Sequence, residues 1–543
     1  MSIYNQLSKS FGSSLAQIDD SQALLNLENS FDLFSKLEKL KNDFGFIMLL
    51  DIYGQDLSEI KSELDVKKEN QVTYILLNME LHFRLRVSIY IDLGKQEVLP
   101  SVSTLWPSAS WCEREAYEMF GISFGNQSEK ALLTSSGTIG FPMRKDFSFN
   151  EEEDVDQSDE FSFVPIANKE KYKVNLSNEF SIGPVHPGLK GSMKVNLQVE
   201  GDDILQANLE VGYLHRGIEK SCESLLYSQI LPLTDRLNYY SSAATNVGWT
   251  MAIEELASID ISDRSKAIRM VSCELARLGD HAQCIGSMAQ STKTLAPFEL
   301  SQKIREIIFH LFEQLCGSRV THSMTRVGGM SREIPAGWSN ECLTRLKTLS
   351  KYVEELSSYL TRSSLWINRL ETTSLNAYDA IAWGITGPNL RACGVNYDIR
   401  RVSPYYFYDD LEFEIPLGIN GDCYDRYLVR VEEMRQSIKI ITQVLDSLPP
   451  GKVSADALSI NEDLGLLSFA PKVGEVYSMT ESPNGELGFY VRSMGETSPY
   501  RVKVRPPSFF SAQLFPKLLP QVKSNDMMLS LCSMNIVAAE VDR

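Results

Sequence analysis

The stretch DRSKAIRMVSCELARLGDHAQCIGSMAQ, residues 263–290, decides the fold of most of this chain. Its apolar residues at positions 267, 270, 271, 275, 278, 282 and 285 recur with the 3.6-residue period of an α-helix. Residues 301–317, 343–370 and 424–448 show similar spacing. This repetition predicts a long helical bundle.

Short β-strands are predicted at both ends of the helical region. Residues 194–217, KVNLQVEGDDILQANLEVGYLHRG, alternate apolar and polar positions around the turn EGDD. GELGFYVRS at 485–493 and PYRVKVR at 499–505 have the composition of strands. The second part of the chain is therefore expected to be mainly helical, with β structure at both ends.

A small α+β domain is predicted before the helical region. FGFIMLLDIYG at 44–54 and QVTYILLNMELHFRLRVSIYIDL at 71–93 are β-rich, and SFDLFSKLEKLKND at 30–43 has a helical pattern. The acidic run NEEEDVDQSDE at 150–160 repels itself, which is typical of a solvated linker. The expected fold class is α+β, with an α+β domain at 1–149, an acidic linker at 150–172 and a helical domain at 173–543.

Composition excludes several classes of protein. The 543 residues carry a net charge of −18, whereas binding to a nucleic-acid backbone needs a basic surface. There is no apolar run of about 18 residues and no secretory signal pattern, so we expect a cytoplasmic protein without a membrane span. The nine cysteines include no CxxC pair, so we expect reduced thiols and no metal held by this chain.

One loop stands out by its composition. GPVHPGLKG, residues 183–191, cannot form regular helix or central strand because of its prolines and glycines. The chain contains no P-loop, dinucleotide-binding fingerprint, HExxH pair or GxSxG elbow. The candidate functional residues are therefore polar groups in loops: His186, Lys190, His215, Arg216, Tyr239, Arg326, Asp422, Asp425 and Arg426.

The order of the loop motifs carries a resemblance to a known family. From residue 183 to 437 the chain reads, in order, GPVHPG, GYLHRGIEK, LTDRLNYYSSA, RVGGMSREIPAGW, GITGPNLRACGVNYDIRR and NGDCYDRYLVRVEEMRQS. These motifs, and the final AAEVDR, resemble the D subunit of respiratory complex I, the NADH:quinone oxidoreductase. WCEREAYEMFGISF at 111–124 and FPMRKDF at 141–147 resemble the C subunit. The whole chain thus resembles a fused C/D subunit of the bacterial complex.

The resemblance implies a peripheral-arm subunit of a translocating oxidoreductase that is inactive alone. Such a subunit forms one wall of the quinone headgroup cavity, beside the terminal iron–sulfur cluster of a neighbouring subunit, and couples quinone reduction to ion pumping. NAD and the iron–sulfur clusters are implied on partner subunits. The implied partners are the terminal-cluster subunit, other peripheral-arm subunits and the membrane subunit of the quinone channel, which hold the chain at the cytoplasmic side of the inner membrane.

The same resemblance implies roles for single residues. Tyr239 matches the quinone-binding tyrosine, and Lys190 stands where the family has the second histidine of an HPxxH loop, its other headgroup ligand. His186 matches the first histidine, which is interpreted as a loop-bracing residue. Arg216 and Arg326 match arginines near the terminal cluster, where positive charge would raise the reduction potential of the cluster.

Three positions depart from the family pattern. Lys190 replaces a histidine, and Ser291 replaces the aspartate that the family pairs with that histidine. Thr321 replaces a histidine beside the terminal cluster, for which the adjacent His322 is a candidate substitute. The quinone site is therefore expected to work with an altered ligand.

The remaining singled-out residues are interpreted as structural. Tyr240 is expected in the core or at an interface. Asp422, Asp425 and Arg426 are expected to form an N-capping and ion-pair cluster that starts a helix.

The family is related to the large subunits of NiFe hydrogenases, which implies a fold of that kind for the helical domain. A hydrogenase needs two CxxC pairs, but this chain has DRLNYYSSA at the first place and Val537 and Glu540 at the second, so hydrogen activation is excluded. Two hypotheses remain for the site: quinone reduction with Tyr239 and Lys190, or a structural adaptor with a degraded quinone site. A related energy-converting complex with ferredoxin or another donor is the alternative assembly.

Overall fold

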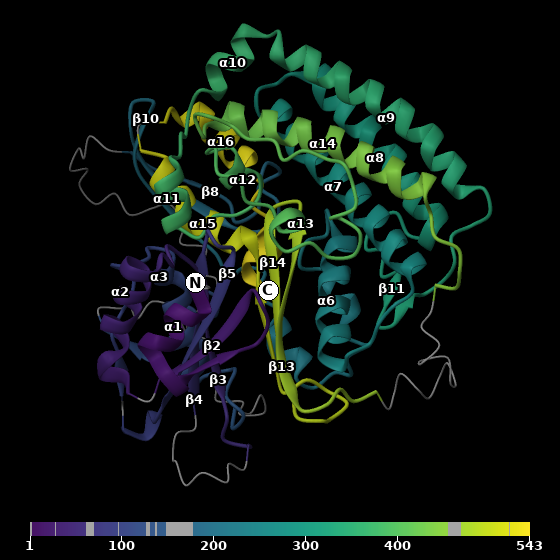
Figure 1. The fold of residues 1–543 in the computed structure, drawn as a ribbon. Coiled ribbons are helices and arrows are strands. Elements are labelled where there is room, and N and C mark those ends of the chain that lie inside the picture. The colour runs from purple at the N-terminus through teal and green to yellow at the C-terminus, as the bar shows by residue number, and fades with distance from the viewer. Residues whose placement is uncertain are drawn as a thin grey trace.

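The computed structural model describes residues 3–27, 29–60, 70–95, 97–125, 131–135, 138–147, 178–453, 469–520 and 522–543. The N-terminal elements lie on one side, the long helices on the other, and the C-terminal strands between them (Figure 1). The expected linker at 150–172 falls outside the described residues. The domain boundaries drawn around it therefore remain a prediction.

The N-terminal part is built on a five-stranded sheet in the order β1-β2-β5-β4-β3. The strands are β1 (Leu15–Gln17), β2 (Gln22–Leu27), β3 (Met48–Asp56), β4 (Asn70–Asn78) and β5 (Phe83–Ile91). Neighbours are antiparallel except β2 and β5, which run parallel. The helices of this part are α1 (Ile3–Phe11), α2 (Leu33–Phe44) and α3 (Ala109–Phe120), and β6 (Val98–Leu99) pairs with β7 (Ser123–Phe124). The strands and the helix predicted from the sequence are confirmed here.

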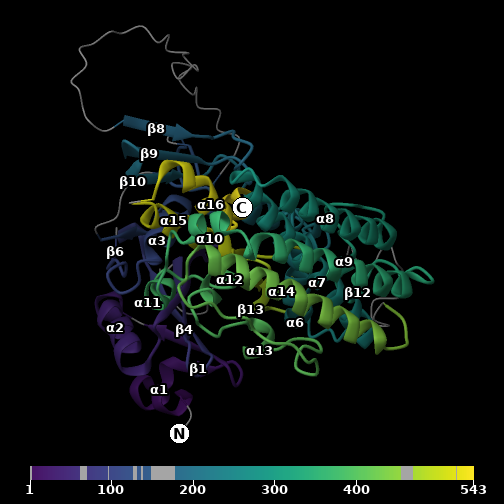
Figure 2. The same ribbon diagram turned by 90° about the horizontal axis from the view of Figure 1, so that it is seen from above.

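A three-stranded antiparallel sheet opens the second part of the chain. It consists of β8 (Asn178–Ile182), β9 (Lys194–Glu200) and β10 (Asp203–Glu210), in the order β10-β9-β8. Strands β9 and β10 form the hairpin predicted around the EGDD turn. The loop 183–191 connects β8 to β9, so both of its ends are fixed in one sheet, which lies far from α1 and α2 (Figure 2).

The predicted helical region is organised around one central helix, α7 (Asp263–Ser291). Its first turn is capped by Ser262, whose side chain accepts a hydrogen bond from the backbone N–H of Ser265. Helix α7 packs against α6, α8, α14 and α16 and is buried on nearly every side. The helices of this region are α4 (Ile218–Cys222), α5 (Leu231–Thr234), α6 (Ser242–Ala257), α7, α8 (Leu295–Cys316), α9 (Trp338–Thr361), α10 (Ser364–Leu370), α11 (Ala377–Ala382), α12 (Pro388–Arg391), α13 (Ile399–Val402) and α14 (Cys423–Asp446).

The C-terminal part returns to the middle of the molecule. Strands β13 (Gly474–Ser482), β14 (Gly485–Ser493) and β15 (Arg501–Arg505) form an antiparallel sheet, as predicted for 485–493 and 499–505. Helices α15 (Pro507–Leu518), α16 (Met527–Met534) and α17 (Ala538–Asp542) follow. A short ribbon of β11 (Thr325–Arg326) and β12 (Gly329–Met330) lies near α7. Arg543 is buried, and its end of the chain lies near the centre of the view (Figure 1).

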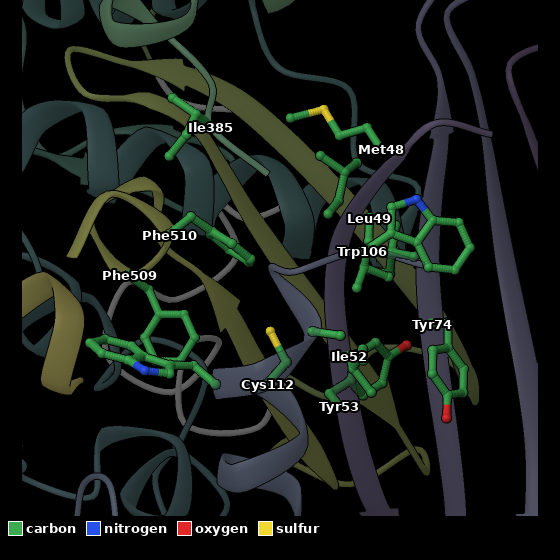
Figure 3. Close-up of a cluster of buried hydrophobic side chains, with 14 of the residues drawn as sticks. Met48, Leu49, Ile52, Tyr53, Tyr74, Trp106, Cys112, Ile385, Phe509 and Phe510 are labelled. Atoms are coloured by element: carbon green, nitrogen blue, oxygen red, sulfur yellow. The ribbon is translucent and has the colours of Figure 1, made fainter. Parts of the chain in front are cut away.

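One hydrophobic core runs through both parts of the chain. Met48 and Trp106 of the N-terminal part belong to the same buried cluster as Ile385 and Phe510 of the second part (Figure 3). The rings of Trp111 and Phe509 meet edge to face with their centroids 5.4 Å apart. The two parts therefore share apolar surface that each would expose alone.

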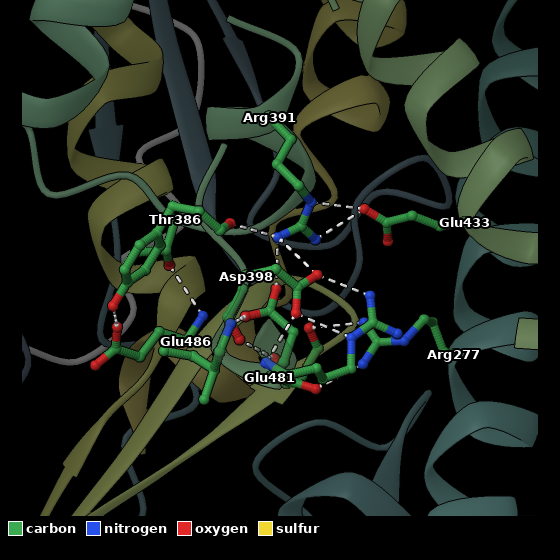
Figure 4. Close-up of polar contacts among 12 residues, drawn as sticks. Arg277, Thr386, Arg391, Asp398, Glu433, Glu481 and Glu486 are labelled. Atoms are coloured by element: carbon green, nitrogen blue, oxygen red, sulfur yellow. Dashed lines mark hydrogen bonds and ion pairs between the residues drawn. The ribbon is translucent and has the colours of Figure 1, made fainter. Parts of the chain in front are cut away.

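Buried ion pairs join the helices to the C-terminal sheet. Arg391 at the end of α12 lies 2.8 Å from Glu433 on α14, 2.9 Å from Glu481 on β13 and 3.3 Å from Asp398 (Figure 4). In the described part of the chain, no helix is both long and apolar enough to cross a membrane.

Candidate functional site

The loop 183–191 is held against the C-terminal segment. The carbonyl of Lys190 accepts a 2.9 Å hydrogen bond from the N–H of Ala538. Gly191 has a φ of +101°, and a Cβ on it would lie only 2.9 Å from the Cβ of Ala538, so no other residue fits this close approach. The Nδ1 atom of His186 accepts a hydrogen bond from the N–H of Gly188 at 3.1 Å. This contact agrees with a loop-bracing role for His186.

Lys190 points inward from this loop. Its side chain is buried, with 6% of the residue exposed, and its amine donates to the side-chain Oδ1 of Asn535. The same amine lies 5.5 Å from the centre of the Tyr240 ring, a distance at which a cation is attracted by the face of an aromatic ring. Lys190 is thus a buried cation and not a solvated loop lysine.

Tyr239 and Tyr240 lie next to Lys190, just before α6. Their ring centroids are 4.6 Å apart, and the Tyr239 hydroxyl is 3.7 Å from the place that a Cβ on Gly191 would take. Burial raises the pKa of Tyr239 well above its usual value, and the charges of Tyr240 and Asp280 add to this effect. The Tyr239 phenol therefore keeps its proton and can donate a hydrogen bond.

A buried acidic group lies beneath Lys190. Asn535 ends α16 with a φ of +57°, and its side-chain nitrogen donates to Asp280 of α7 at 2.8 Å. Asn484 donates to the nearby Glu540 at 3.4 Å. Burial raises the pKa of Glu540 to about 7, and the charge of Asp280 contributes in the same direction.

Arg216 lies in a segment that is clamped to the C-terminus. Its guanidinium donates to the carbonyl of Ala539 at 2.8 Å and to that of Arg236 at 3.1 Å, and the residue remains exposed. Next to it, the Nδ1 atom of His215 makes a 2.6 Å hydrogen bond with the carbonyl of Asp542. Arg216 is therefore fixed in direction while its surface remains accessible.

Arg326 lies on β11 and does not contact Lys190. Its guanidinium donates to the carbonyls of Ser323 and Thr325 at 2.6 and 2.7 Å. Burial lowers the pKa of Arg326, whereas the charge of the buried Asp235 raises it. Asp235 accepts hydrogen bonds from Ser323 and from Asn246.

The positions that depart from the family pattern have local partners. The ring of His322 stacks on Phe312 with centroids 3.6 Å apart, and its Nδ1 atom is 2.9 Å from the hydroxyl of Ser242. Burial lowers the pKa of His322 to about 4, so this histidine is a neutral core residue at neutral pH. The hydroxyl of Ser291 donates to the carbonyl of Met288 in its own helix at 2.7 Å.

The predicted cluster at the start of α14 is confirmed as a cap. The side chain of Asp422 accepts from the N–H of Asp425 at 2.8 Å, and Asp425 accepts from the N–H of Gly421 at 3.1 Å. Arg426 differs from the prediction because it donates to neutral groups, including the Gly421 carbonyl and the Thr373 hydroxyl. Hydrogen bonds to the neighbouring loop, and not an ion pair, therefore hold this end of the helix.

The surroundings of Lys190 include residues that the sequence did not connect with it. Tyr240, expected in the core or at an interface, is half-buried between two cations, with the Arg305 guanidinium 5.9 Å and the Lys190 amine 5.5 Å from its ring centre. Asn535 and Asp280 gave no motif or spacing that could single them out. They belong to different helices, and only the tertiary structure brings them together.

A cavity of about 850 Å³ lies beside this region, between α3 and α4. It is lined in part by Lys145, Arg216, Glu219 and Arg543, but by neither Lys190 nor Tyr239. Among the described residues there is no group of three or more histidine, cysteine or acidic side chains that could hold a metal ion. Of the nine cysteines, all but Cys316 are buried, as expected for small core residues.

Comparisons with known proteins cover both parts of the chain. The family model described as the respiratory-chain NADH dehydrogenase 49 Kd subunit matches residues 292–543, and that of the 30 Kd subunit matches residues 29–153. A Bdellovibrio bacteriovorus protein, named as the C/D subunit of NADH-quinone oxidoreductase, is 39% identical over 93% of this chain and 92% of its own length. An Aquifex aeolicus C/D subunit of the same enzyme is 35% identical over 94% of both chains, and a Myxococcus xanthus D subunit is 39% identical over 67% of this chain and 92% of its own. The chain therefore belongs to the family of fused C/D subunits of NADH-quinone oxidoreductase, and it is a subunit of an oxidoreductase complex.

Proposed function

We propose that the loop 183–191 and the turn before α6 form one wall of a quinone headgroup site, with Tyr239 and Lys190 as its two polar groups. The observation that carries the proposal is that Lys190 meets the adjacent pair Tyr239 and Tyr240, which comes from a separate segment of the chain. A quinone that takes two electrons needs two protons, because uncompensated charge is costly in a pocket of low dielectric constant. A protonated phenol and a buried ammonium group can supply hydrogen bonds, charge and protons to the two carbonyl oxygens.

The position of Arg216 supports a neighbouring redox centre on another subunit. Its guanidinium is anchored by backbone carbonyls yet exposed, so its charge can act on a group brought by a partner. In this proposal the partner carries the terminal iron–sulfur cluster, Arg326 contributes positive charge near it, and NADH is oxidised on other subunits. The chain is peripheral at the cytoplasmic side of the inner membrane, and quinone reduction there is coupled to ion pumping.

A structural adaptor is the second candidate, and one observation favours it. The amine of Lys190 is already bonded to Asn535, so part of its hydrogen-bonding capacity is used within the chain. An ammonium group has three donors, so two remain for a ligand. The same geometry would serve a related energy-converting complex in which ferredoxin or another donor replaces NADH.

Tyr239→Phe in the assembled complex tests the proposal. Loss of a hydroxyl that donates to the quinone should cost roughly 1–3 kcal/mol in the limiting step, or about ten- to hundredfold in rate. Electron transfer from NADH to an artificial acceptor upstream of the site should survive. Tyr378→Phe, on an exposed tyrosine of α11, is the matched control. An unchanged quinone reductase rate in Tyr239→Phe would favour the adaptor.

A further inference from the structure

A continuous buried polar path leads from Lys190 into the helical core. The amine of Lys190 donates to Oδ1 of Asn535, and Nδ2 of Asn535 donates to Oδ1 of Asp280 at 2.8 Å. An ammonium group can only donate and a carboxylate can only accept, so only this orientation of the Asn535 amide satisfies both neighbours. We propose that Asp280 is the counter-ion of Lys190 and positions its ammonium group through the Asn535 side chain.

The bridging residue is held from several directions. Asn535 occupies the left-handed region that ends α16, which an asparagine tolerates better than most residues. Its amide also donates to the side chain of Asn484. Three residues further, the N–H of Ala538 donates to the carbonyl of Lys190, so the bridge and the loop that carries the lysine are fixed to each other.

The buried carboxylate of Asp280 destabilises the fold unless a cation interacts with it. It is fully buried, and its Oδ2 atom has no hydrogen-bond partner among the described residues. An isolated carboxylate in the interior is strongly destabilising, and so is an isolated ammonium group, whereas the two together compensate each other. Lys190 at 6% exposure is the cation that the Asn535 amide connects to this carboxylate.

The other charged groups around Asp280 fit this assignment. Arg305 of α8 and the phenol of Tyr239 both interact with its charge, and the second acid in the region is Glu540. Because burial raises the pKa of Glu540 to about 7, Glu540 is the acid that holds a proton near neutrality. The Asn535 amide bonds to Asp280 and not to Glu540, so the geometry selects Asp280 as the counter-ion.

This role rests on the proposed quinone site and adds a residue to it. Asp280 lies beneath the site and acts through another side chain, so it is a positioning residue rather than a catalytic one. Its charge attracts the ammonium group of Lys190 and holds it in place between Tyr240 and Asn535. Without that charge, the buried ammonium group is destabilised and its position is lost.

The test moves a carboxylate from position 280 to position 535 in the assembled complex. Asp280→Asn should lower the quinone reductase kcat severalfold or more, while NADH oxidation by an upstream artificial acceptor and the yield of complex stay unchanged. Adding Asn535→Asp to Asp280→Asn puts a carboxylate directly on the Lys190 amine and should restore most of the rate. Asp263→Asn is the matched control, because Asp263 is an exposed aspartate at the start of the same helix.

Two further variants make the outcome decisive. Asn535→Gly suits the positive φ and deletes the bridging amide, together with its bond to Asn484. It should match the loss in Asp280→Asn, and it decides the question if Asp280→Asn blocks assembly. In a Lys190→Met background, Asp280→Asn should cause no additional loss. A full quinone rate in Asp280→Asn, no rescue by Asn535→Asp, or losses that add to those of Lys190→Met would overturn the inference. If Lys190→Met itself keeps the full quinone rate, the proposed function fails instead.

Discussion

Replacing Arg391 by methionine should lower the free energy of unfolding by about 3–5 kcal/mol. The guanidinium is fully buried and reaches Glu433 at 2.8 Å, Glu481 at 2.9 Å and Asp398 at 3.3 Å (Figure 4). Methionine fills the side-chain volume but removes the charge and its donors. The cost arises because buried carboxylates remain without their cation, which is more destabilising than the net value of an intact pair.

The three carboxylates around Arg391 are not destabilised equally when its charge is removed. Asp398 keeps Arg400 at 2.8 Å, and Glu433 keeps His281 at 2.7 Å. Burial and the charge of Asp398 raise the pKa of Glu481 to about 7, while Arg391 lowers it. Without Arg391, Glu481 takes up a proton at neutral pH and relieves part of the repulsion. We therefore expect the loss to fall near the lower end of the range.

The loss of unfolding free energy in Arg391→Met should be smaller at acid pH than at neutral pH. Burial alone would raise the pKa of Glu433, but Arg391 and His281 hold it well below its usual range. The stability that this depressed pKa provides is present above the unfolded pKa of about 4.3 and is lost as the pH falls below it. Arg391→Met lacks most of that contribution, so wild type and variant should converge in acid.

Guanidinium chloride unfolding of the full-length chain at neutral and acid pH measures both effects. Arg345→Met is the control, because the exposed Arg345 on α9 lies 3.4 Å from Glu341 and such surface pairs contribute roughly 0–1 kcal/mol. A loss of less than about 1 kcal/mol in Arg391→Met, or an equal loss at both pH values, would refute the reasoning.

Two other predictions concern the fold. Cleavage at a protease site inserted between residues 154 and 159 should leave the two parts of the chain associated in size-exclusion chromatography, because Trp106 and Phe510 belong to one hydrophobic core. Separation of the two fragments would contradict this prediction. The stability advantage of the wild type over His322→Gln should fall as the pH drops from about 6.5 towards 4, because His322 has a pKa of about 4 when folded and a higher one when unfolded. A difference in unfolding free energy that stays constant over this range would show that His322 does not titrate in it.

Local patterns in the sequence predict much of the fold. The helix at 263–290, the hairpin at 194–217, the strands at 485–493 and 499–505 and the Asp422 cap all form as expected, because each depends on periodicity or on a side chain within a few residues. The burial of α7 on nearly all sides could not be predicted in this way. It depends on α14 and α16, which pack on the helix from far away in the sequence.

Some residues of the candidate site could likewise be predicted from the sequence, and others could not. His186, Lys190, Tyr239 and Arg216 could be found because they stand in loops with unusual composition and in a recognisable order. Asp280 sits in the middle of an amphipathic helix, where a polar residue is expected to face solvent, so the sequence gives it no distinguishing feature.

In the proposed pairing, the acid beneath this site is at position 280 and not at the position that the family resemblance implies. The family resemblance places an acid at position 291, which is eleven residues and therefore about 16 Å further along α7. In this chain Ser291 occupies that position and bonds to the carbonyl of Met288. Lysine carries its charge on a flexible four-carbon stem, so the charge of Lys190 reaches Asn535 beneath the loop, whereas an imidazole ring would end closer to the backbone. In the proposed pairing the Asn535 amide links Lys190 to Asp280, so the lysine does not need an acid at position 291.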